Sequence, residues 1–247
     1  MSTPFDLPIE LPRLAASMLE RVRQQAPRVH CLMNTVVQKL VADGLSALGA
    51  IPSMTSSSDE VQDFARKADA LVVNLGTLDK QRREAIGLAL DIVATRAIPW
   101  LLDPAHCDYS PMRVRFAQDL LEHQPTALRA NAAEYELLTV PDRVVAVETG
   151  AVDRISFAGR MVMVASGDPL MARVTGTGCL CGAVIAAFLA VDDEPHAATA
   201  AAMVVLGVAA EKATLRAGGP GSFEPALLDA LAALDGEDIL ERAKVTG

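Results

Sequence analysis

Short apolar segments alternate with longer segments of helical spacing along most of this sequence. Six of the apolar segments have the length and composition of buried β-strands. They cover residues 28–32, 50–53, 70–74, 100–102, 127–129 and 144–148. Strands that alternate with helices favour an α/β fold, in which helices cover both faces of a mainly parallel central sheet. In such folds, ligands bind beyond the carboxyl ends of the strands.

The segments between and after these strands predict the helices. We expect helices over residues 14–25, 35–48, 79–95, 131–138, 178–191, 195–215 and 222–234, and one that ends near residue 123. Ser57 and Glu60 have the spacing of a capping box and predict a further helix start. Residues 154–157 and 161–165 predict a hairpin, and residues 1–12 predict an extended lead-in.

Length and composition bound the class of protein. The 247 residues are enough for one large domain with a substantial core, so we expect a single domain over residues 1–247. The net charge of −9 without a basic cluster argues against a nucleic-acid partner, and we interpret Arg82 and Arg83 as a solvated helix face. Four cysteines, no secretory signal and no apolar run of about 18 residues predict a reduced, cytoplasmic protein without a membrane span.

The stretch Val174-Thr175-Gly176-Thr177-Gly178-Cys179 is the strongest functional signal. Two glycines around one small hydroxyl residue let the backbone turn tightly and approach a ligand closely. The apolar run that follows predicts a buried helix, so the glycines would lie at its N-terminus, where free N–H groups bind a negative oxygen. The same field favours the thiolate of Cys179 in the first turn. This combination suits phosphoryl transfer.

Two other interpretations of the glycine stretch stay open. One is a dinucleotide fingerprint, although Gly182 lies one residue beyond the G-x-G-x-x-G spacing and no continuous strand runs into the motif. The other is a glycine-rich helix cap beside a core cysteine. Sites of two further kinds are not expected, because the chain lacks the cysteine and histidine spacing of structural zinc and the G-x-S-x-G elbow of an acyl-transfer serine.

Polar residues follow the predicted strands, and each has a functional and a structural interpretation. Asp103 and Glu134 would hold Mg²⁺, mostly through water, or else start a turn and cap a helix. Arg129 would clamp phosphate oxygens or form a surface ion pair. Thr149 would place a hydroxyl beside a phosphate or base, or simply begin a turn. Met54 would press against an aromatic ligand or fill the core.

Seven segments match a known family in order and spacing. They are residues 29–34 (VHCLMN), 44–50, 68–78 (ADALVVNLGTL), 102–104 (LDP), 129–134 (RANAAE), 174–179 and 219–223 (GPGSF). Through these segments the chain resembles the hydroxyethylthiazole kinases over nearly its whole length. This family phosphorylates the alcohol of a thiazole in thiamine salvage. The resemblance implies a ribokinase-like three-layer α/β/α fold, ATP and Mg²⁺ as cofactors, and a homotrimer with active sites at subunit interfaces.

The resemblance also implies a role for individual positions. Cys179 stands where many ribokinase-like enzymes place a catalytic aspartate, and Gly176, Thr177 and Gly178 would form an anion hole beside it. Arg129 and Thr149 match the positions that contact ATP, and we expect Asn131 beside them. Met54 matches the thiazole position, and we expect Asn34 and Gly176 to contact the thiazole with it. Asp103 and Glu134 match the acidic pair near magnesium.

The chain departs from the family after Pro104. Where the family usually has Val-Gly-Val-Gly-Ala, this sequence has Ala105-His106-Cys107-Asp108-Tyr109, and Asp108 would repel a phosphate or recruit a cation. Ala130 stands where glycine is usual, residues 56–58 differ, and Asp168 replaces a usual histidine. Two alternatives therefore stay open: a kinase of a different small alcohol on the same fold, and a non-catalytic homologue that binds thiazole or nucleotide.

Overall fold

The computed structural model describes residues 6–247. In that part of the chain, one nine-stranded sheet has the order β2-β1-β3-β4-β5-β6-β7-β8-β9. The first six strands pair parallel with one another, and the last three are added by antiparallel pairing. The strands are β1 (Arg28–Leu32), β2 (Ile51–Ser53), β3 (Ala70–Asn74), β4 (Trp100–Asp103), β5 (Ala127–Asn131), β6 (Val145–Thr149), β7 (Asp153–Phe157), β8 (Arg160–Val164) and β9 (Val245–Thr246).

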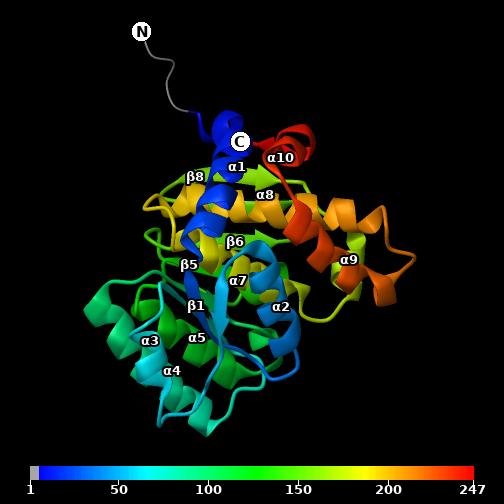
Figure 1. Ribbon diagram of the computed structural model, residues 1–247. Coiled ribbons are helices and arrows are strands. Elements are labelled where there is room, and N and C mark those ends of the chain that lie inside the picture. Colours follow the sequence, from blue (N-terminus) through cyan, green and yellow to red (C-terminus); the bar gives the residue numbers. More distant parts are fainter. Residues whose placement is uncertain (1–5) are drawn as a thin grey trace.

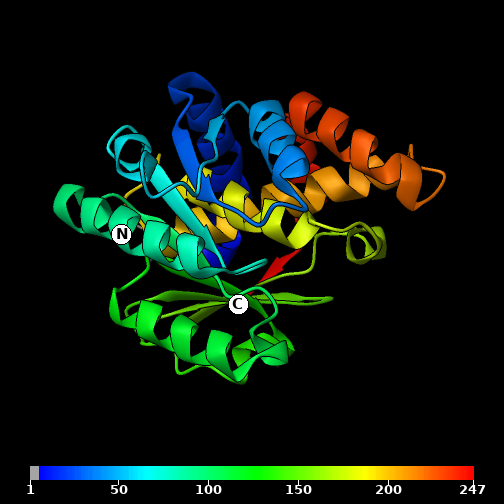
Figure 2. The ribbon, with the colours of Figure 1, turned by 90° about the horizontal axis from the view of Figure 1, so that it is seen from below.

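Helices cover both faces of the sheet (Figures 1 and 2). One face carries α1 (Leu7–Gln25), α2 (Gln38–Leu48), α7 (Thr177–Leu189), α8 (Pro195–Thr214) and α9 (Pro220–Ala233) over the larger apolar core. The other carries α3 (Val61–Ala65), α4 (Lys80–Arg96) and α5 (Pro111–Glu122) over a second core. Two short helices, α6 (Ala132–Tyr135) and α10 (Gly236–Arg242), complete the set in residues 6–247. The predicted α/β/α layering is confirmed.

Strand β3 shows why its sequence is continuously apolar. Val72 packs into the larger core, whereas Leu71 and Val73 pack into the second core on the other face. Because successive side chains of a strand point to opposite faces, a sheet covered on both sides needs apolar residues at every position. The apolar runs in the sequence therefore located the central strands correctly.

Helix α7 is the central element of the larger core, since it packs against β1, β3 and β4 as well as α2 and α8. Helix α7 lies close to its neighbours because there is a glycine at two of the contacts, one on α2 and one on α7 itself. A Cβ on Gly44 of α2 would lie 2.4 Å from Leu180, and one on Gly182 of α7 would lie 3.1 Å from Leu101 of β4. The close packing fixes the N-terminus of α7 at the carboxyl ends of the strands.

Helix α8 is long and apolar enough to cross a membrane by length and composition, and 83% of its most apolar 18-residue segment is buried inside the structure.

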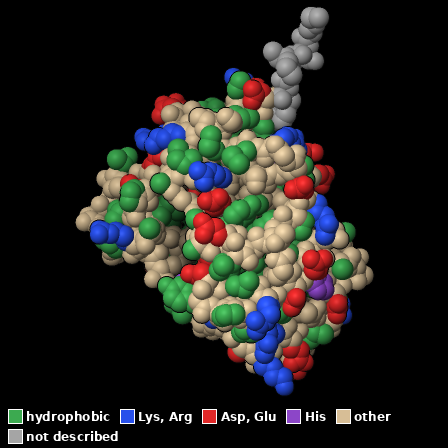
Figure 3. Space-filling view, turned by 180° about the vertical axis from the view of Figure 1, so that it is seen from behind, with side chains coloured by type: hydrophobic (Ala, Val, Ile, Leu, Met, Phe, Trp, Pro, Cys, Tyr) green, Lys and Arg blue, Asp and Glu red, His purple; other side chains and the backbone are tan. Residues whose placement is uncertain are grey.

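On the face of the molecule in Figure 3, basic side chains lie at separate places among acidic ones.

Two expectations near the N-terminus are wrong. The extended lead-in fails from Leu7 onward, because α1 begins there and buries Leu11 and Ala15. Pro8 lies in the first turn, where a missing N–H costs nothing. Residues 1–5 of that predicted lead-in lie outside the described residues. Helix α2 starts at Gln38, three residues later than expected.

The predicted capping box at Ser57 is also wrong. The Ser57 hydroxyl accepts from the backbone of Asp59, and the Glu60 carboxylate accepts from the Thr55 hydroxyl at 2.5 Å. The helix that follows, α3, starts only at Val61.

The last third of the chain holds more than the three expected helices. Helix α10 follows a capping box between Asp235 and Asp238, and β9 then pairs with β8 at the edge of the sheet.

Candidate functional site

The carboxyl ends of β1, β3 and β4 meet the first turn of α7 in a bonded group of side chains. Asn74, at the end of β3, donates from Nδ2 to Asp103 Oδ2 at 2.7 Å and accepts at Oδ1 from Asn34 Nδ2 at 3.1 Å. Both amide nitrogens also lie 3.4 Å from Cys179 Sγ. The structure thus brings Asn34, Asp103 and Cys179 together as expected, with Asn74 between them.

Arg129 extends this group to β5 and β6. Its Nη1 lies 3.4 Å from Asp103 Oδ1, and its Nη2 donates to Thr149 Oγ1 at 3.2 Å. Burial raises the pKa of Asp103, and the positive charge of Arg129 opposes that rise. Burial likewise works against the charge on Arg129, but the Asp103 carboxylate raises the pKa of Arg129 overall. The pair is therefore a buried ion pair, and the surface ion pair considered for Arg129 is wrong.

The N-terminus of α7 offers unused backbone donors. Gly176 caps the helix with φ of 99°, a left-handed conformation that favours glycine. In the described part of the chain, no acceptor is bonded to the amides of Thr177, Gly178 or Cys179. The Thr177 hydroxyl, by contrast, donates to the carbonyls of Met171 and Val174. The Thr177 hydroxyl is therefore occupied, and the three backbone amides are the donors that remain for an anion.

Gly178 places these donors beside Arg129. A Cβ at this position would lie 2.7 Å from Arg129 Nη2, so the guanidinium rests directly over the first turn of α7. The helix follows the 3-10 turn η2 (Pro169–Arg173) and not a strand, which argues against the dinucleotide fingerprint. The geometry is an anion site of backbone amides beside one buried guanidinium.

A cavity of about 510 Å³ opens beside this anion site. Its walls include Arg129, Thr149 and Gly178, and Met203 and Leu206 contribute apolar surface. Cys179 is not among the lining residues, so the thiol faces the asparagines while the cavity lies next to the guanidinium. A cavity of this size is in the range of small-ligand and cofactor sites.

Comparison with known proteins decides the family. Residues 19–141 and 135–237 match the Hydroxyethylthiazole kinase family. The chain belongs to this family. A probable hydroxyethylthiazole kinase of Agrobacterium fabrum is 56% identical over 94% of this chain and 94% of its own length. The hydroxyethylthiazole kinase of Serratia proteamaculans is 41% identical over 91% of this chain and 95% of its own.

Solved structures agree with the fold. The hydroxyethylthiazole kinase protein from Pyrococcus horikoshii superposes with a TM-score of 0.91 at 35% identity, covering 95% of this chain and 98% of that one. A ribokinase-like superfamily protein from Enterococcus faecalis superposes with a TM-score of 0.62 at 15% identity, covering 87% of this chain and 93% of that one. At this identity the similarity is evidence for the fold only. The ribokinase-like architecture expected from the hydroxyethylthiazole kinase resemblance is confirmed.

The expectation of a thiolate at Cys179 is wrong. Burial, with the nearby Asp103 charge, raises the pKa of Cys179 to about 12, and Arg129 only partly opposes this. The desolvation of a half-buried sulfur thus outweighs the field of the helix N-terminus. At neutral pH this hydroxyethylthiazole kinase homologue holds a protonated thiol that the two asparagines orient.

Slow alkylation of Cys179 is the expected consequence. With a pKa of about 12, roughly one thiol in 10⁴ is ionised at pH 8, so iodoacetamide should label it about 10³-fold more slowly than in the unfolded chain. Mass spectrometry of the Cys179 peptide, with urea-unfolded protein as control, measures this ratio. A labelling midpoint near pH 7 would contradict the assignment.

Because the pKa of Cys179 is higher in the folded than in the unfolded chain, ionisation of this thiol should also destabilise the fold as the pH rises from about 9 to about 12.

Glu134 and Asn131 form a capping box at the start of α6, which confirms the structural alternative for Glu134. Asn131 Oδ1 accepts from the Glu134 amide at 3.0 Å, and Glu134 Oε2 accepts from the Asn131 amide at 2.9 Å. Glu134 Oε1 also accepts from the His106 amide at 2.7 Å. The buried Glu134 thus lies beside the loop that departs from the family, and neither cap residue is hydrogen-bonded to Asp103.

Met54 lies after the edge strand β2 and packs against the larger core. It agrees with the core-filling alternative, and it is not part of the bonded group around Cys179.

The interpretation of Arg82 as a solvated side chain is wrong. Its guanidinium is buried and donates to the carbonyls of Leu32 at 3.0 Å, Asn74 at 2.8 Å and Gly76. It thereby connects the ends of β1 and β3, where Asn74 ends β3 and Asn34 follows β1 by two residues. The signal was its place on the apolar face of α4, where it precedes the buried Ala85 and Ile86 by three and four residues. Arg83 is exposed as expected.

Proposed function

We propose that this chain catalyses the ATP-dependent phosphorylation of the hydroxyl group of 4-methyl-5-(2-hydroxyethyl)thiazole in thiamine salvage. The names of relatives at 56% and 41% identity over nearly the whole chain support this substrate. The observation that carries the proposal is the row of unbonded amides at residues 177–179, which adjoins a cavity and a buried guanidinium on one side and the Cys179 thiol on the other.

The proposed roles follow from this arrangement. The phosphates of ATP would contact the amides of the 176–178 segment, with Arg129 and Thr149 beside them and Asn131 further along the same edge. The transition state of phosphoryl transfer is largely dissociative, so positioning and charge stabilisation matter more than early proton removal. A protonated Cys179 suits that demand, because it would orient the acceptor alcohol, and with its proton in place it does not act as a general base. Asn34, Gly176 and Met54 would contact the thiazole.

Asp103 and Glu134 fit Mg²⁺ through water better than by direct ligation. Asp103 already accepts from Asn74 and Arg129, and both oxygens of Glu134 accept backbone N–H groups. Each oxygen keeps a lone pair for a water of a hydrated magnesium ion. When bound, Mg²⁺ would neutralise charge on the transferred phosphoryl group.

A coupled assay of ADP release tests the proposal, with the thiazole alcohol and hydroxymethylpyrimidine as competing acceptors. We expect turnover with the thiazole alcohol and little with the pyrimidine. Turnover with a different alcohol would favour the alternative that the altered loop at residues 105–109 points to. Thermal stabilisation by ATP without ADP release from any alcohol would show a non-catalytic binding protein.

The proposal extends to the oligomeric state of the protein and its cellular compartment. We infer a homotrimer of single-domain chains in which the pocket lies at a subunit interface. Val36, Ile51 and Phe64 support this, since they expose large apolar surface on or beside β1 and β2, next to the thiazole position. The four unpaired cysteines fit a reduced cytoplasmic setting. Analytical ultracentrifugation that finds only monomer at micromolar concentration would contradict the trimer.

A further inference from the structure

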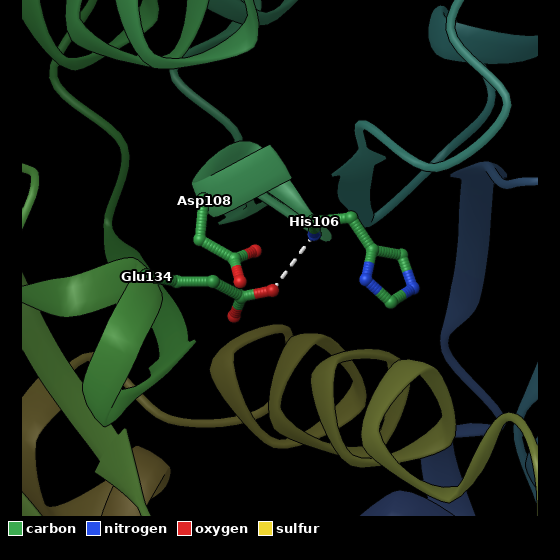
Figure 4. A group of neighbouring side chains, drawn as sticks. All are labelled: His106, Asp108 and Glu134. Atoms are coloured by element: carbon green, nitrogen blue, oxygen red, sulfur yellow. Dashed lines mark hydrogen bonds between the residues drawn. The ribbon is translucent and has the colours of Figure 1, made fainter. Parts of the chain in front are cut away.

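The loop between β4 and α5 brings an imidazole and two carboxylates to one place. His106 and Asp108 lie on this loop and its 3-10 turn η1 (Cys107–Tyr109), and Glu134 lies on α6. One ligand atom from each of these three side chains lies within 4.8 Å of the other two. Figure 4 shows the two carboxylates facing each other, with the imidazole beside them and the bond from the His106 amide to Glu134.

Backbone hydrogen bonds fix the position of the Glu134 side chain. Glu134 Oε1 accepts from the His106 amide at 2.7 Å, and Oε2 accepts from the Asn131 amide at 2.9 Å. Each carboxylate oxygen has a second lone pair that these bonds leave free. These two donors therefore orient the Glu134 side chain, and each of its oxygens keeps a lone pair for a metal ion.

Negative charge in this group has no matching cation. Within residues 6–247, no basic side chain lies within 4.0 Å of the carboxylate of Asp108 or Glu134. Arg113, on the neighbouring α5, donates instead to the Ala105 carbonyl at 3.1 Å. Glu134 is only 3% exposed, and a buried carboxylate without an ion-pair partner is costly. The charge of the two carboxylates also raises the pKa of Cys107, which burial raises first.

We propose that His106, Asp108 and Glu134 form a binding site for one divalent transition-metal ion of the Mn²⁺ or Co²⁺ type. One imidazole nitrogen and carboxylate oxygens match the ligands of such ions, whereas Mg²⁺ prefers oxygen and keeps its waters. His106 and Asp108 are exposed, so small rotations would bring their ligand atoms to bonding distance around the fixed Glu134. Glu134 is also proposed to hold Mg²⁺ through water, so the two ions would share this carboxylate. Binding of the transition metal alone does not depend on the proposed kinase reaction.

A purely structural role for His106 would be packing, because its ring lies edge-on to Tyr109 with centroids 5.6 Å apart. The test therefore replaces it with phenylalanine, which keeps a ring and removes the nitrogens. Asp108→Asn removes one charge at nearly constant shape. His123→Phe and Asp119→Asn are matched controls at exposed positions outside the cluster.

The experiment titrates Mn²⁺ alone into the nucleotide-free full chain and follows free Mn²⁺ by electron paramagnetic resonance. We expect one site per chain that a 100-fold excess of Mg²⁺ does not empty. His106→Phe and Asp108→Asn should each weaken binding at least tenfold, and the two controls should leave it unchanged. Equal affinity in His106→Phe, or no saturable binding in the wild type, would overturn the site.

A spectroscopic signature covers the case in which a variant folds poorly. Bound Mn²⁺ in the wild-type chain should show ¹⁴N coupling from one imidazole in electron spin echo modulation. If bound Mn²⁺ shows no nitrogen coupling, His106 is not a ligand and the proposal fails without recourse to any variant. Failure of the kinase assay would leave this result untouched, since the titration contains neither nucleotide nor alcohol.

Discussion

Replacing Gly178 with alanine is expected to lower kcat/KM for the thiazole alcohol by about 10²-fold while the fold is retained. The new Cβ would lie 2.7 Å from Arg129 Nη2 and 3.1 Å from its Cζ. The guanidinium must then move from its place between Asp103 and Thr149, and the methyl group narrows the approach to the amides of the first turn. Loss of one such preorganised donor costs about 10²–10³ in rate. Steady-state kinetics with varied ATP measures the effect.

Gly87→Ala is the matched control for this substitution. Gly87 also lies within a helix, and a Cβ there has nothing within 4 Å. We expect unchanged kinetics and a gain in stability of up to about 1 kcal/mol from helix propensity. Wild-type kcat/KM in Gly178→Ala would show that Arg129 and these amides do not act on the transferred group.

The substitution Asp103→Asn is expected to lower the free energy of unfolding by about 3 kcal/mol and to abolish most of the kinase activity. Asp103 is fully buried and is the carboxylate paired with Arg129. Breaking a buried pair by removing one partner leaves an uncompensated charge, which typically costs about 3–5 kcal/mol. Urea unfolding followed by circular dichroism measures the loss.

Two further variants test whether the loss of stability comes from breaking the buried ion pair and not from removing any carboxylate. Asp63→Asn removes the carboxylate of an exposed pair with Arg66 and should change stability by less than about 1 kcal/mol. The double variant Asp103→Asn with Arg129→Leu removes both charges, so it should recover part of the loss. A loss below about 1 kcal/mol in Asp103→Asn alone would contradict the buried pair.

Local sequence patterns located the elements but not their long-range bonds. The apolar run of β3 and the glycine stretch before α7 were sufficient to locate these two elements, because buried strands and helix starts have local signals in the sequence. Arg82 was misread because its acceptors Leu32 and Asn74 lie on strands that only the folded chain brings near.

The chemistry of the site was harder to predict for the same reason. Cys179 lies in the first turn of a helix as expected, but its acidity depends on the desolvation caused by packing around α7. The nearness of His106 to Glu134 follows from the turn after β4 and the cap of α6, which are 28 residues apart. Spacing rules for metal ligands do not detect such a pair.

The contact of α1 with α8 and α10 has a consequence for synthesis of the protein. Helix α1 packs mainly against helices that are translated much later, so the apolar face of α1 stays unpaired on the ribosome until α8 and α10 have been made. Such exposed surface invites chaperone binding and aggregation. The larger core is therefore complete only after α10 has been made, and the junction of α7 with the strand ends, which belongs to that core, forms late as well.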